Sequence, residues 1–408
     1  MAIDNKDKKI LNVPPLRFPE FTEEWKAEQL DNIATLSKGI GISKEQLSED
    51  GEPCILYGEL YTKYKSEIIK QVESKTDING SKLKRSKAND VIIPCSGETA
   101  VDIATARCVP FDNILFGGDL NVISLHQYDG AFMSYQLNGK RKYDIARVAQ
   151  GVSIVHLYGE HLKAIKTYNP TLPEQQKIAK LLSLLDDRID TQNKIIEKYE
   201  SLIKGLNDSL YAQYGDDVLT SFSSLGFSYS GLSGKSAQDF GSGKPFITYL
   251  NVYSNNIINE KDFQYVAIKE GEKQNVVEYG DVLFTLSSET PEEVGIGSVY
   301  LGNENVYLNS FCFGIHIINT KIAFPPYLSY YVSSTPFRKF IYPYAQGSTR
   351  FNLCKVDFEK ASIKLPSLEN QKRIYSILSH IESKTETEKS LLDLYNSQKQ
   401  YLLRQMFI

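Results

Sequence analysis

Residues 172–206 read LPEQQKIAKLLSLLDDRIDTQNKIIEKYESLIKGL, and residues 368–402 read LENQKRIYSILSHIESKTETEKSLLDLYNSQKQYL. The second segment begins 196 positions after the first, and identical residues recur between them in one register without a gap. The shared pairs include Leu172/Leu368, Gln175/Gln371, Ile178/Ile374, Leu182/Leu378, Tyr199/Tyr395 and Leu206/Leu402. Self-similarity at a fixed spacing indicates an internal repeat. The chain therefore has two halves of related design, each ending in one of these segments.

Both segments are predicted to be long helices. Alternating steps of four and three residues meet apolar side chains at nine of ten positions from Ile178, and at seven of ten from Ile374. This period is typical of a helix seam that packs against a second helix. The predicted helix–helix seam consists of Ile178, Leu182, Leu185, Ile189, Ile196, Tyr199, Ile203, Leu206, Ile374, Leu378, Ile381, Leu392, Tyr395 and Leu402.

The length of each helix implies that its apolar stripe packs against another part of the chain. A helix of about 40 residues is about 60 Å long, and its apolar stripe must be covered. The other segment offers a matching stripe, so we expect the two to pair as an antiparallel coiled coil. The alternative is that each helix packs on the core of its own globular region.

The remaining regions are predicted to be α+β domains. Short apolar strands such as 91–95, 282–286 and 311–318 alternate with glycine-rich and asparagine-rich turns, without the regular strand–helix alternation of a doubly wound sheet. The fold class expected is α+β, with two repeated globular domains joined by two long antiparallel helices in a pseudo-two-fold arrangement. The predicted boundaries are 13–170 and 213–365 for the domains, and 171–212 and 366–408 for the helices.

Composition restricts the function more than it reveals it. The 46 basic and 50 acidic residues give a net charge of −4, so a nucleic-acid partner would have to be bound by local basic patches. The five cysteines contain no CxxC pair, which favours a reducing cytoplasm over a disulfide framework. No apolar run approaches the roughly 18 residues of a membrane span. A cytoplasmic protein with no membrane partner is expected.

No catalytic or metal-binding motif is complete. Residues 324–327 read Phe-Pro-Pro-Tyr, but Phe324 replaces the Asn or Asp with which amino-methyltransferases hold a flipped base, so a turn leading into a helix is the better interpretation. Residues 241–244 resemble the end of a phosphate-binding loop, but Gln238 and Pro245 occupy positions that need glycine and a hydroxyl residue. The five histidines have no paired ligand spacing. We expect no catalytic residue and no metal ligand.

Two basic runs and two glycine turns are the candidate DNA-binding residues. Basic side chains near glycine-rich turns commonly bind phosphates or base edges, although such runs usually mark a solvated face. The turn at 346–350 offers backbone amides, two hydroxyls and a guanidinium, and a plain turn explains it equally well. The predicted DNA-binding residues are Lys82, Lys84, Arg85, Lys87, Lys140, Arg141, Gln150, Gln346, Ser348, Thr349 and Arg350.

The combination of repeat and motif resembles a known family. A helix that opens with Leu-Pro-Glu-Gln-Gln-Lys-Ile-Ala at 172–179 and continues with Leu-Leu-Asp-Asp-Arg-Ile-Asp at 184–190 is similar to the pattern of type I restriction-modification specificity (S) subunits. The opening at 14–25, with Trp25, also looks like that family, and the resemblance covers the whole chain. The second helix departs from the pattern at 369–373, where Glu-Asn-Gln-Lys-Arg lacks the proline.

The resemblance implies a non-catalytic DNA-binding subunit. Each globular domain would be a target-recognition domain for one half of a bipartite double-stranded DNA site, and the helices would act as spacers and dock the partners. Those partners would be methyltransferase (M) subunits, two in number, and restriction/translocase (R) subunits. S-adenosylmethionine, ATP and Mg²⁺ would bind to the partner subunits and no cofactor to this chain. The alternatives are a coiled-coil scaffold with two protein-binding domains and a self-sufficient DNA methyltransferase.

Overall fold

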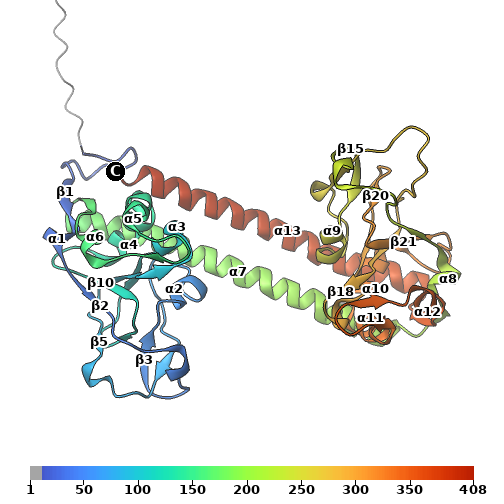
Figure 1. Cartoon of the computed structure of the whole chain (residues 1–408), viewed down its shortest axis with the longest axis horizontal. Helices are drawn as coiled ribbons and strands as arrows, with labels where there is room; N and C mark the ends of the chain where they lie inside the picture. Colours follow the sequence, from blue (N-terminus) through green and yellow to red (C-terminus); the bar gives the residue numbers. More distant parts are fainter. Residues whose placement is uncertain (1–11) are drawn as a thin grey trace, which may run out of the picture. The chain divides into compact units, whose positions relative to one another are not determined.

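A computed structural model describes residues 12–408 (Figure 1). The chain forms two compact units. Unit 1 contains the described residues up to Asn193 together with Ser390–Ile408, and unit 2 contains Lys194–Lys389. Within the described residues, no helix combines the length and the apolar character that crossing a bilayer requires.

Unit 1 is built around a four-stranded antiparallel sheet with the order β2-β10-β6-β8. A second sheet has the order β4-β3-β9-β5, and two pairs, β1-β12 and β11-β7, complete the strands. The strands are β1 Lys26–Gln29, β2 Ala34–Lys38, β3 Glu52–Ile55, β4 Lys75–Thr76, β5 Lys84–Arg85, β6 Asp90–Pro94, β7 Ser96–Gly97, β8 Arg107–Val109, β9 Leu115–Phe116, β10 Leu120–Leu125, β11 Val155–His156 and β12 Lys166–Asn169. The helices are α1 Leu30–Ile33, α2 Glu59–Thr62, α3 Ala100–Ile103, α4 Gly130–Asn138, α5 Lys142–Val148 and α6 Gly159–Lys163, with 3-10 turns η1 Lys44–Gln46 and η2 Gly80–Lys82.

Unit 2 repeats this plan with a four-stranded antiparallel sheet of order β14-β21-β17-β19. The strand pair β13-β24 corresponds to β1-β12, and three-stranded sheets β16-β15-β20 and β18-β23-β22 complete the unit. The strands are β13 Val218–Thr220, β14 Gly226–Ser230, β15 Phe240–Ile247, β16 Gln264–Val266, β17 Val282–Thr285, β18 Ser287–Ser288, β19 Gly297–Val299, β20 Tyr307–Leu308, β21 Cys312–Ile317, β22 Ala345–Gln346, β23 Phe351–Leu353 and β24 Ile363–Leu365. The helices are α8 Phe222–Leu225, α9 Tyr249–Ser254, α10 Pro325–Ser333, α11 Thr335–Ile341 and α12 Lys355–Lys360, with 3-10 turns η3 Ala237–Asp239, η4 Glu260–Asp262, η5 Pro291–Glu293 and η6 Tyr342–Tyr344.

Two long helices are shared by the units. Helix α7 is Leu172–Tyr214 and helix α13 is Leu368–Gln405. The sequence-based boundaries place these helices outside the two domains, whereas contacts assign one half of each helix to each unit. The reason is antiparallel pairing, which brings the start of one helix against the end of the other. The mixed helix and strand content and the two long helices confirm the predicted fold class.

In unit 1, the start of α7 packs against both its own domain and the end of α13. Ile178, Ala179 and Leu182 share one buried cluster with Trp25 and Phe132 of the domain, and with Leu403, Met406 and Phe407 at the end of α13. The ring centroids of Trp25 and Phe407 are 6.4 Å apart. Both partners proposed for the helix are therefore found in one cluster.

In unit 2, the same arrangement places the end of α7 beside the start of α13. Ile374 and Leu378 belong to the main buried cluster, against which Ile203 and Leu206 pack in partly buried positions. Farther along, Lys389 forms an ion pair with Glu200, with 3.1 Å between Nζ and Oε1. All fourteen predicted seam residues are buried or partly buried.

A glutamine near the start of each long helix ties it to its unit. The Gln175 side chain accepts a hydrogen bond from the backbone N–H of Asp129 at the start of α4 and donates to the Pro170 carbonyl. Gln371 accepts from the backbone N–H of Phe324 at the start of α10 and donates to the Pro366 carbonyl. The Phe324–Pro325–Pro326 segment is the N-terminus of α10, as the sequence indicates.

The seam of unit 1 contains one buried charged cluster. Lys399 Nζ lies 2.6 Å from Glu67 Oε2 and 2.7 Å from Asp186 Oδ1, and Tyr135 donates to Asp186 Oδ2 at 2.7 Å. Burial raises the pKa of Asp186, and Lys399 opposes that rise. The three charged side chains are at most 13% exposed, so they depend on one another and on Tyr135 for their polar partners.

We predict that Lys399→Met destabilises unit 1 by about 3–5 kcal/mol, because it removes the cation that pairs directly with the buried carboxylates of Glu67 and Asp186, leaving only the longer-range interaction with Arg107. The free energy of unfolding, measured by urea titration, reports the loss. Removing Lys399 should raise the pKa of Asp186 further, so the deficit should shrink as the pH falls and the carboxyl is protonated. The control is Lys389→Met, whose side chain is 44% exposed and which should cost about 1 kcal/mol or less. Equal losses in the two variants would contradict the account.

Candidate nucleic-acid interface

Each unit carries a β-hairpin whose tip has a backbone conformation that requires a glycine. In unit 1, Gln150 and His156 exchange backbone hydrogen bonds of 2.8 and 2.6 Å, and β11 continues along β7. In unit 2, Gln346 of β22 pairs with Asn352 of β23, and β23 also pairs with β18. The two hairpins occupy equivalent places in the repeat, beside the strand that follows the central β6 or β17.

The glycine is required by the backbone of the tip. Gly151 and Gly347 have φ of +122° and +147°, values that L side chains rarely adopt. A Cβ atom would lie 2.1 Å from the carbonyl oxygen three residues on, that of Ile154 or Arg350. The tips, defined as residues 151–154 and 347–350, thus share one conformation and differ only in the side chains that they present.

The tip of unit 2 presents polar side chains and one cation. Gln346, Ser348, Thr349 and Arg350 are all exposed. Arg350 Nη2 donates to Ser287 Oγ at 3.2 Å, and its guanidinium lies 5.9 Å from the Phe311 ring centroid. The structure therefore brings all four predicted residues of this half together on one hairpin.

The tip of unit 1 presents apolar side chains. Val152 is 98% exposed and Ile154 61% exposed, while Gln150 stands exposed at the base of the hairpin. Ser153 and Ile154 form one wall of a cleft of about 1060 Å³, which Tyr57, Tyr61 and Arg107 also line. The Arg107 side chain is already hydrogen-bonded within unit 1, because its Nε donates to the Tyr64 carbonyl at 2.7 Å.

The predicted basic runs of unit 1 do not join the hairpin in one cluster. Lys84 and Arg85 form β5, in the lower part of unit 1 in Figure 1, whereas Lys140 and Arg141 lie between α4 and α5 in its upper part. Lys82, Lys87 and Lys140 are exposed.

The two arginines of these runs are already bound within unit 1. Arg85 makes two bonds to Glu52, of 2.6 and 3.0 Å, which lower the pKa of that carboxyl. Arg141 donates to the Ile408 carbonyl at 3.1 Å and pairs with Asp144. Both side chains are therefore engaged in contacts that stabilise unit 1, rather than free to bind DNA.

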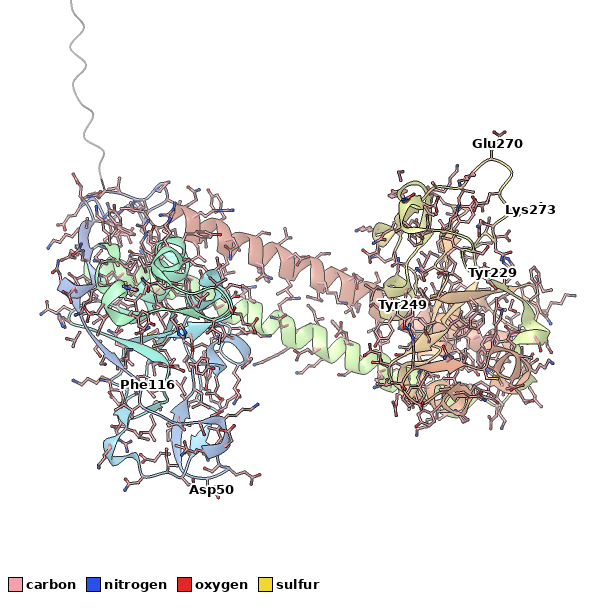
Figure 2. All side chains as sticks on the ribbon, in the orientation of Figure 1. Asp50, Phe116, Tyr229, Tyr249, Glu270 and Lys273 are labelled. Carbon is pink, nitrogen blue, oxygen red and sulfur yellow. The ribbon has the colours of Figure 1, made fainter. Side chains whose placement is uncertain are left out.

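Sequence reasoning missed the tyrosines beside each hairpin. Residues 55–61 and 247–253 share the pattern Ile-x-Tyr-x-x-(Leu/Val)-Tyr, which could have indicated them. Tyr61 donates to the carbonyl of Ser96 in β7 at 3.0 Å. Tyr249, which is labelled in Figure 2, donates to the carbonyl of Ser287 in β18 at 2.9 Å. The tyrosines thus hold the strand edge against which each hairpin pairs.

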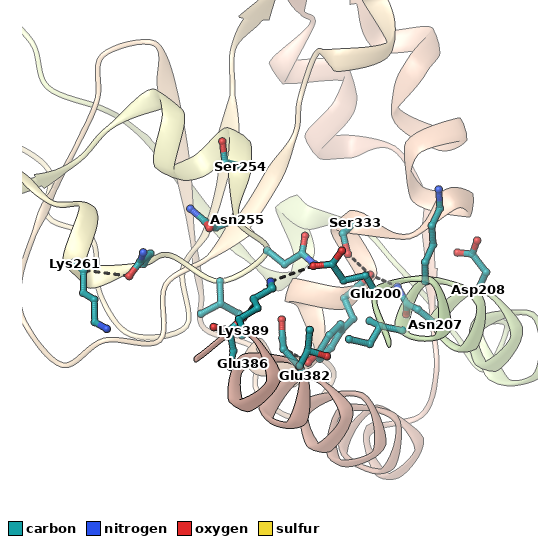
Figure 3. A pocket seen from close by; sticks show the side chains of 17 residues that line it. Glu200, Asn207, Asp208, Ser254, Asn255, Lys261, Ser333, Glu382, Glu386 and Lys389 are labelled. Carbon is teal, nitrogen blue, oxygen red and sulfur yellow. Dashed lines mark hydrogen bonds and ion pairs between the residues drawn. The ribbon is translucent and has the colours of Figure 1, made fainter. Parts of the chain in front are cut away.

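A polar cavity of about 800 Å³ in unit 2 has the wrong charge for DNA (Figure 3). Four carboxylates and three lysines line it, namely Glu200, Asp208, Glu382, Glu386, Lys204, Lys261 and Lys389. Lys389 bridges Glu200 and Glu386, and Tyr330 donates to Glu382. The excess of negative charge disfavours phosphate.

Residues 12–408 contain no cluster of His, Cys, Asp and Glu side chains suited to holding a metal ion. His316 is hydrogen-bonded through Nδ1 to Asp281 at 2.8 Å and stacks on Tyr229, with ring centroids 4.3 Å apart. Tyr229 is in β14, His316 is in β21 and Asp281 directly precedes β17, so these contacts link neighbouring strands of the β14-β21-β17-β19 sheet.

The sequence model of the family described as the type I restriction modification DNA specificity domain matches residues 22–201 and 233–394. These two regions make up most of the chain and repeat one domain twice. The chain belongs to this family. Specificity subunits of type I systems are non-catalytic DNA-recognition subunits, and their partners are DNA and the methyltransferase and restriction subunits. The comparisons give no support to the coiled-coil scaffold alternative.

Solved specificity-subunit structures share the fold over their full length. The crystal structure of a type I restriction-modification S subunit from M. genitalium aligns with a TM-score of 0.58 at 17% identity, covering 97% of this chain and 99% of that one. A structure described as showing complex assembly and conformational transition of the type I R-M system aligns with a TM-score of 0.58 at 16% identity, covering 95% and 98%.

We predict that Gly347→Ala impairs DNA recognition, because the new Cβ must displace the tip that carries Arg350. Methylation by this specificity subunit together with its methyltransferase should fall, while the melting temperature changes little because the tip is exposed. Gly271→Ala is the matched control, since Gly271 also has positive φ (+78°) but faces open space. Unchanged methylation by Gly347→Ala would show that the tip conformation is unimportant.

Proposed function

We propose that each unit reads one half of a bipartite duplex DNA target with the surface around the tip of its hairpin. The observation that carries this proposal is that one hairpin conformation recurs in both units with different exposed side chains, Val-Ser-Ile in one and Ser-Thr-Arg in the other. A constant scaffold with changed contact groups is what two readers of different sequences require.

The hairpins suit contacts to DNA better than the other surfaces described above. The exposed arginine, hydroxyls and backbone amides of tip 347–350 can meet phosphate oxygens or base edges. The lining of the 800 Å³ cavity has no positive excess to attract a polyanion, and Arg85 and Arg141 are already paired within unit 1. Lys82, Lys87 and Lys140 stay candidates for phosphate contacts that add affinity without sequence preference.

We further infer that catalysis and its cofactors reside on the partner subunits. S-adenosylmethionine would bind to the methyltransferase subunits, and ATP and Mg²⁺ would bind to the partners that translocate and cleave DNA. This agrees with the incomplete glycine loops and with Phe324 in the Pro-Pro segment, which serves as the N-terminus of α10. The complex is proposed to act in the cytoplasm.

Two methyltransferase subunits are proposed, one on each unit. Exposed apolar residues recur at one repeat position on the long helices. Leu181 of α7 in unit 1 is 36% exposed, and Ile377 of α13 in unit 2, 196 positions later, is 39% exposed. A single exposed apolar residue is common on protein surfaces, so it is the recurrence at equivalent repeat positions that supports the docking of two copies of the same partner.

A domain exchange tests the reading of half-sites. Replacing residues 213–365 with the corresponding domain of a related specificity subunit should change one half of the methylated site and leave the other half intact. Sequencing of the methylated positions in a host that expresses the chimera with its methyltransferase gives the answer, with the unaltered chain as control. A change in both halves would contradict independent reading.

Single substitutions test the stoichiometry. Leu181→Glu and Ile377→Glu should each leave one methyltransferase subunit bound instead of two, as measured by native mass spectrometry, and the double variant should bind none. Leu394→Glu is the control, since Leu394 is 66% exposed but its counterpart, Lys198, is not apolar. Two bound subunits in the double variant would rule out these contacts.

A further inference from the structure

The fourth residue of each tip is where the two units differ most in chemistry. Ile154 and Arg350 stand 196 positions apart, and in each tip the carbonyl oxygen of this residue would lie 2.1 Å from a Cβ atom added to the glycine three positions earlier. The strand after each tip leads to a matching backbone bond of 2.8 Å, from Leu157 to Cys95 in unit 1 and from Leu353 to Leu286 in unit 2. The two side chains are therefore held at the same place on the same scaffold.

The Arg350 guanidinium is oriented by its neighbours and can donate to two hydrogen-bond acceptors that lie in one plane. A guanidinium has five N–H donors, and among the described residues the hydrogen bond to Ser287 is the one that Arg350 makes. The guanidinium also lies 5.9 Å from the centroid of the Phe311 ring, and Ser287 is buried and accepts a hydrogen bond from Tyr249 at its carbonyl. An arginine oriented in this way by its neighbours loses little freedom on binding, which suits the bidentate contact that arginine makes with guanine O6 and N7.

Ile154 and Val152 present the opposite chemistry. The two residues are 61% and 98% exposed, and their side chains have no polar atom with which to meet phosphate. In the major groove of DNA, the apolar feature is the C5-methyl group of thymine. On a surface that contacts DNA, these side chains therefore suit thymine and discriminate against cytosine, which lacks the methyl group.

We propose that the fourth tip residue determines base specificity: Arg350 reads a guanine in the half-site of unit 2, and Ile154 reads a thymine in the half-site of unit 1. This inference rests on the proposed function and assigns base chemistry to the same surfaces. If Arg350 reads a guanine, it does not act through its charge alone, since a purely electrostatic contact would accept any base.

The experiment measures methylation by the complex of this chain with its methyltransferase on duplexes of the recognised site. Arg350→Lys keeps the charge but loses the fork, and should lower the preference for guanine at one position of the second half-site by roughly 5- to 150-fold. Replacing that guanine with 7-deazaguanine should weaken the wild type and have little further effect on the variant. Lys364→Ala, which removes an exposed charge paired with Asp216 elsewhere in unit 2, is the control and should change no base preference.

For unit 1, Ile154→Ala is combined with deoxyuridine in place of thymine, which removes the methyl group alone. Each change should lower methylation by about 4-fold, and both together by little more than either, because they remove the same contact.

Four outcomes are decisive. Full guanine preference in Arg350→Lys would assign Arg350 to phosphate and overturn the inference for unit 2. Additive effects of Ile154→Ala and deoxyuridine, or a first half-site without thymine, would overturn it for unit 1. A wild-type complex that methylates no bipartite site would instead refute the proposed function, which separates the two failures.

Discussion

The structure depends on the burial of an apolar stripe along two helices that each domain alone cannot cover. The start of α7 lies on a groove of unit 1 that the last residues of α13 complete, with Phe407 fully buried beside Trp25 and Phe132. The start of α13 is covered in the same way by the end of α7 in unit 2. Each unit therefore needs residues from both halves of the chain, and the antiparallel direction of the helices follows from that need.

Polar residues define the register in which the helices dock. Gln175 and Gln371 each bind the N-terminus of a domain helix, and Glu174 accepts two bonds of 2.7 Å from Arg17 together with a bond from the Trp25 indole. These residues are buried, so an unpaired partner would be costly. The motif at the start of α7 is thus a set of buried hydrogen bonds, which explains why its glutamine recurs in α13.

Much of this architecture could be predicted from the sequence because period and repeat are local signals. The seam from Ile178 onward, the two helices and the mixed strand content all follow from spacing and composition. The sequence-based boundaries did not divide each helix between the two units, although the antiparallel pairing implies that division. The polar seam positions were also unexpected, since Lys399 appears in the sequence as an interruption and in the structure as the cation of a buried cluster.

The hairpin surface proposed as the DNA contact contains more of the sequence-predicted residues in unit 2 than in unit 1. The turn at 346–350 combines glycine, hydroxyls and an arginine, which is a readable signal, whereas Val152 and Ile154 carry no charge and were passed over. Conversely, Arg85 and Arg141 were selected for their charge. Their partners Glu52 and Ile408 are far from them in the sequence, so these contacts could not be inferred from spacing. Charge alone identifies a free cation poorly, because pairing depends on the fold.

The completion of unit 1 by the end of α13 can be tested directly, because Trp25 is the only tryptophan. Phe407→Asp should place a charge against the indole and shift the emission of Trp25 to longer wavelength. The amides of residues 172–193 should lose protection from hydrogen exchange, while those of 222–365 keep theirs. Unchanged emission and unchanged protection in unit 1 would contradict the claim that both halves of the chain build this unit.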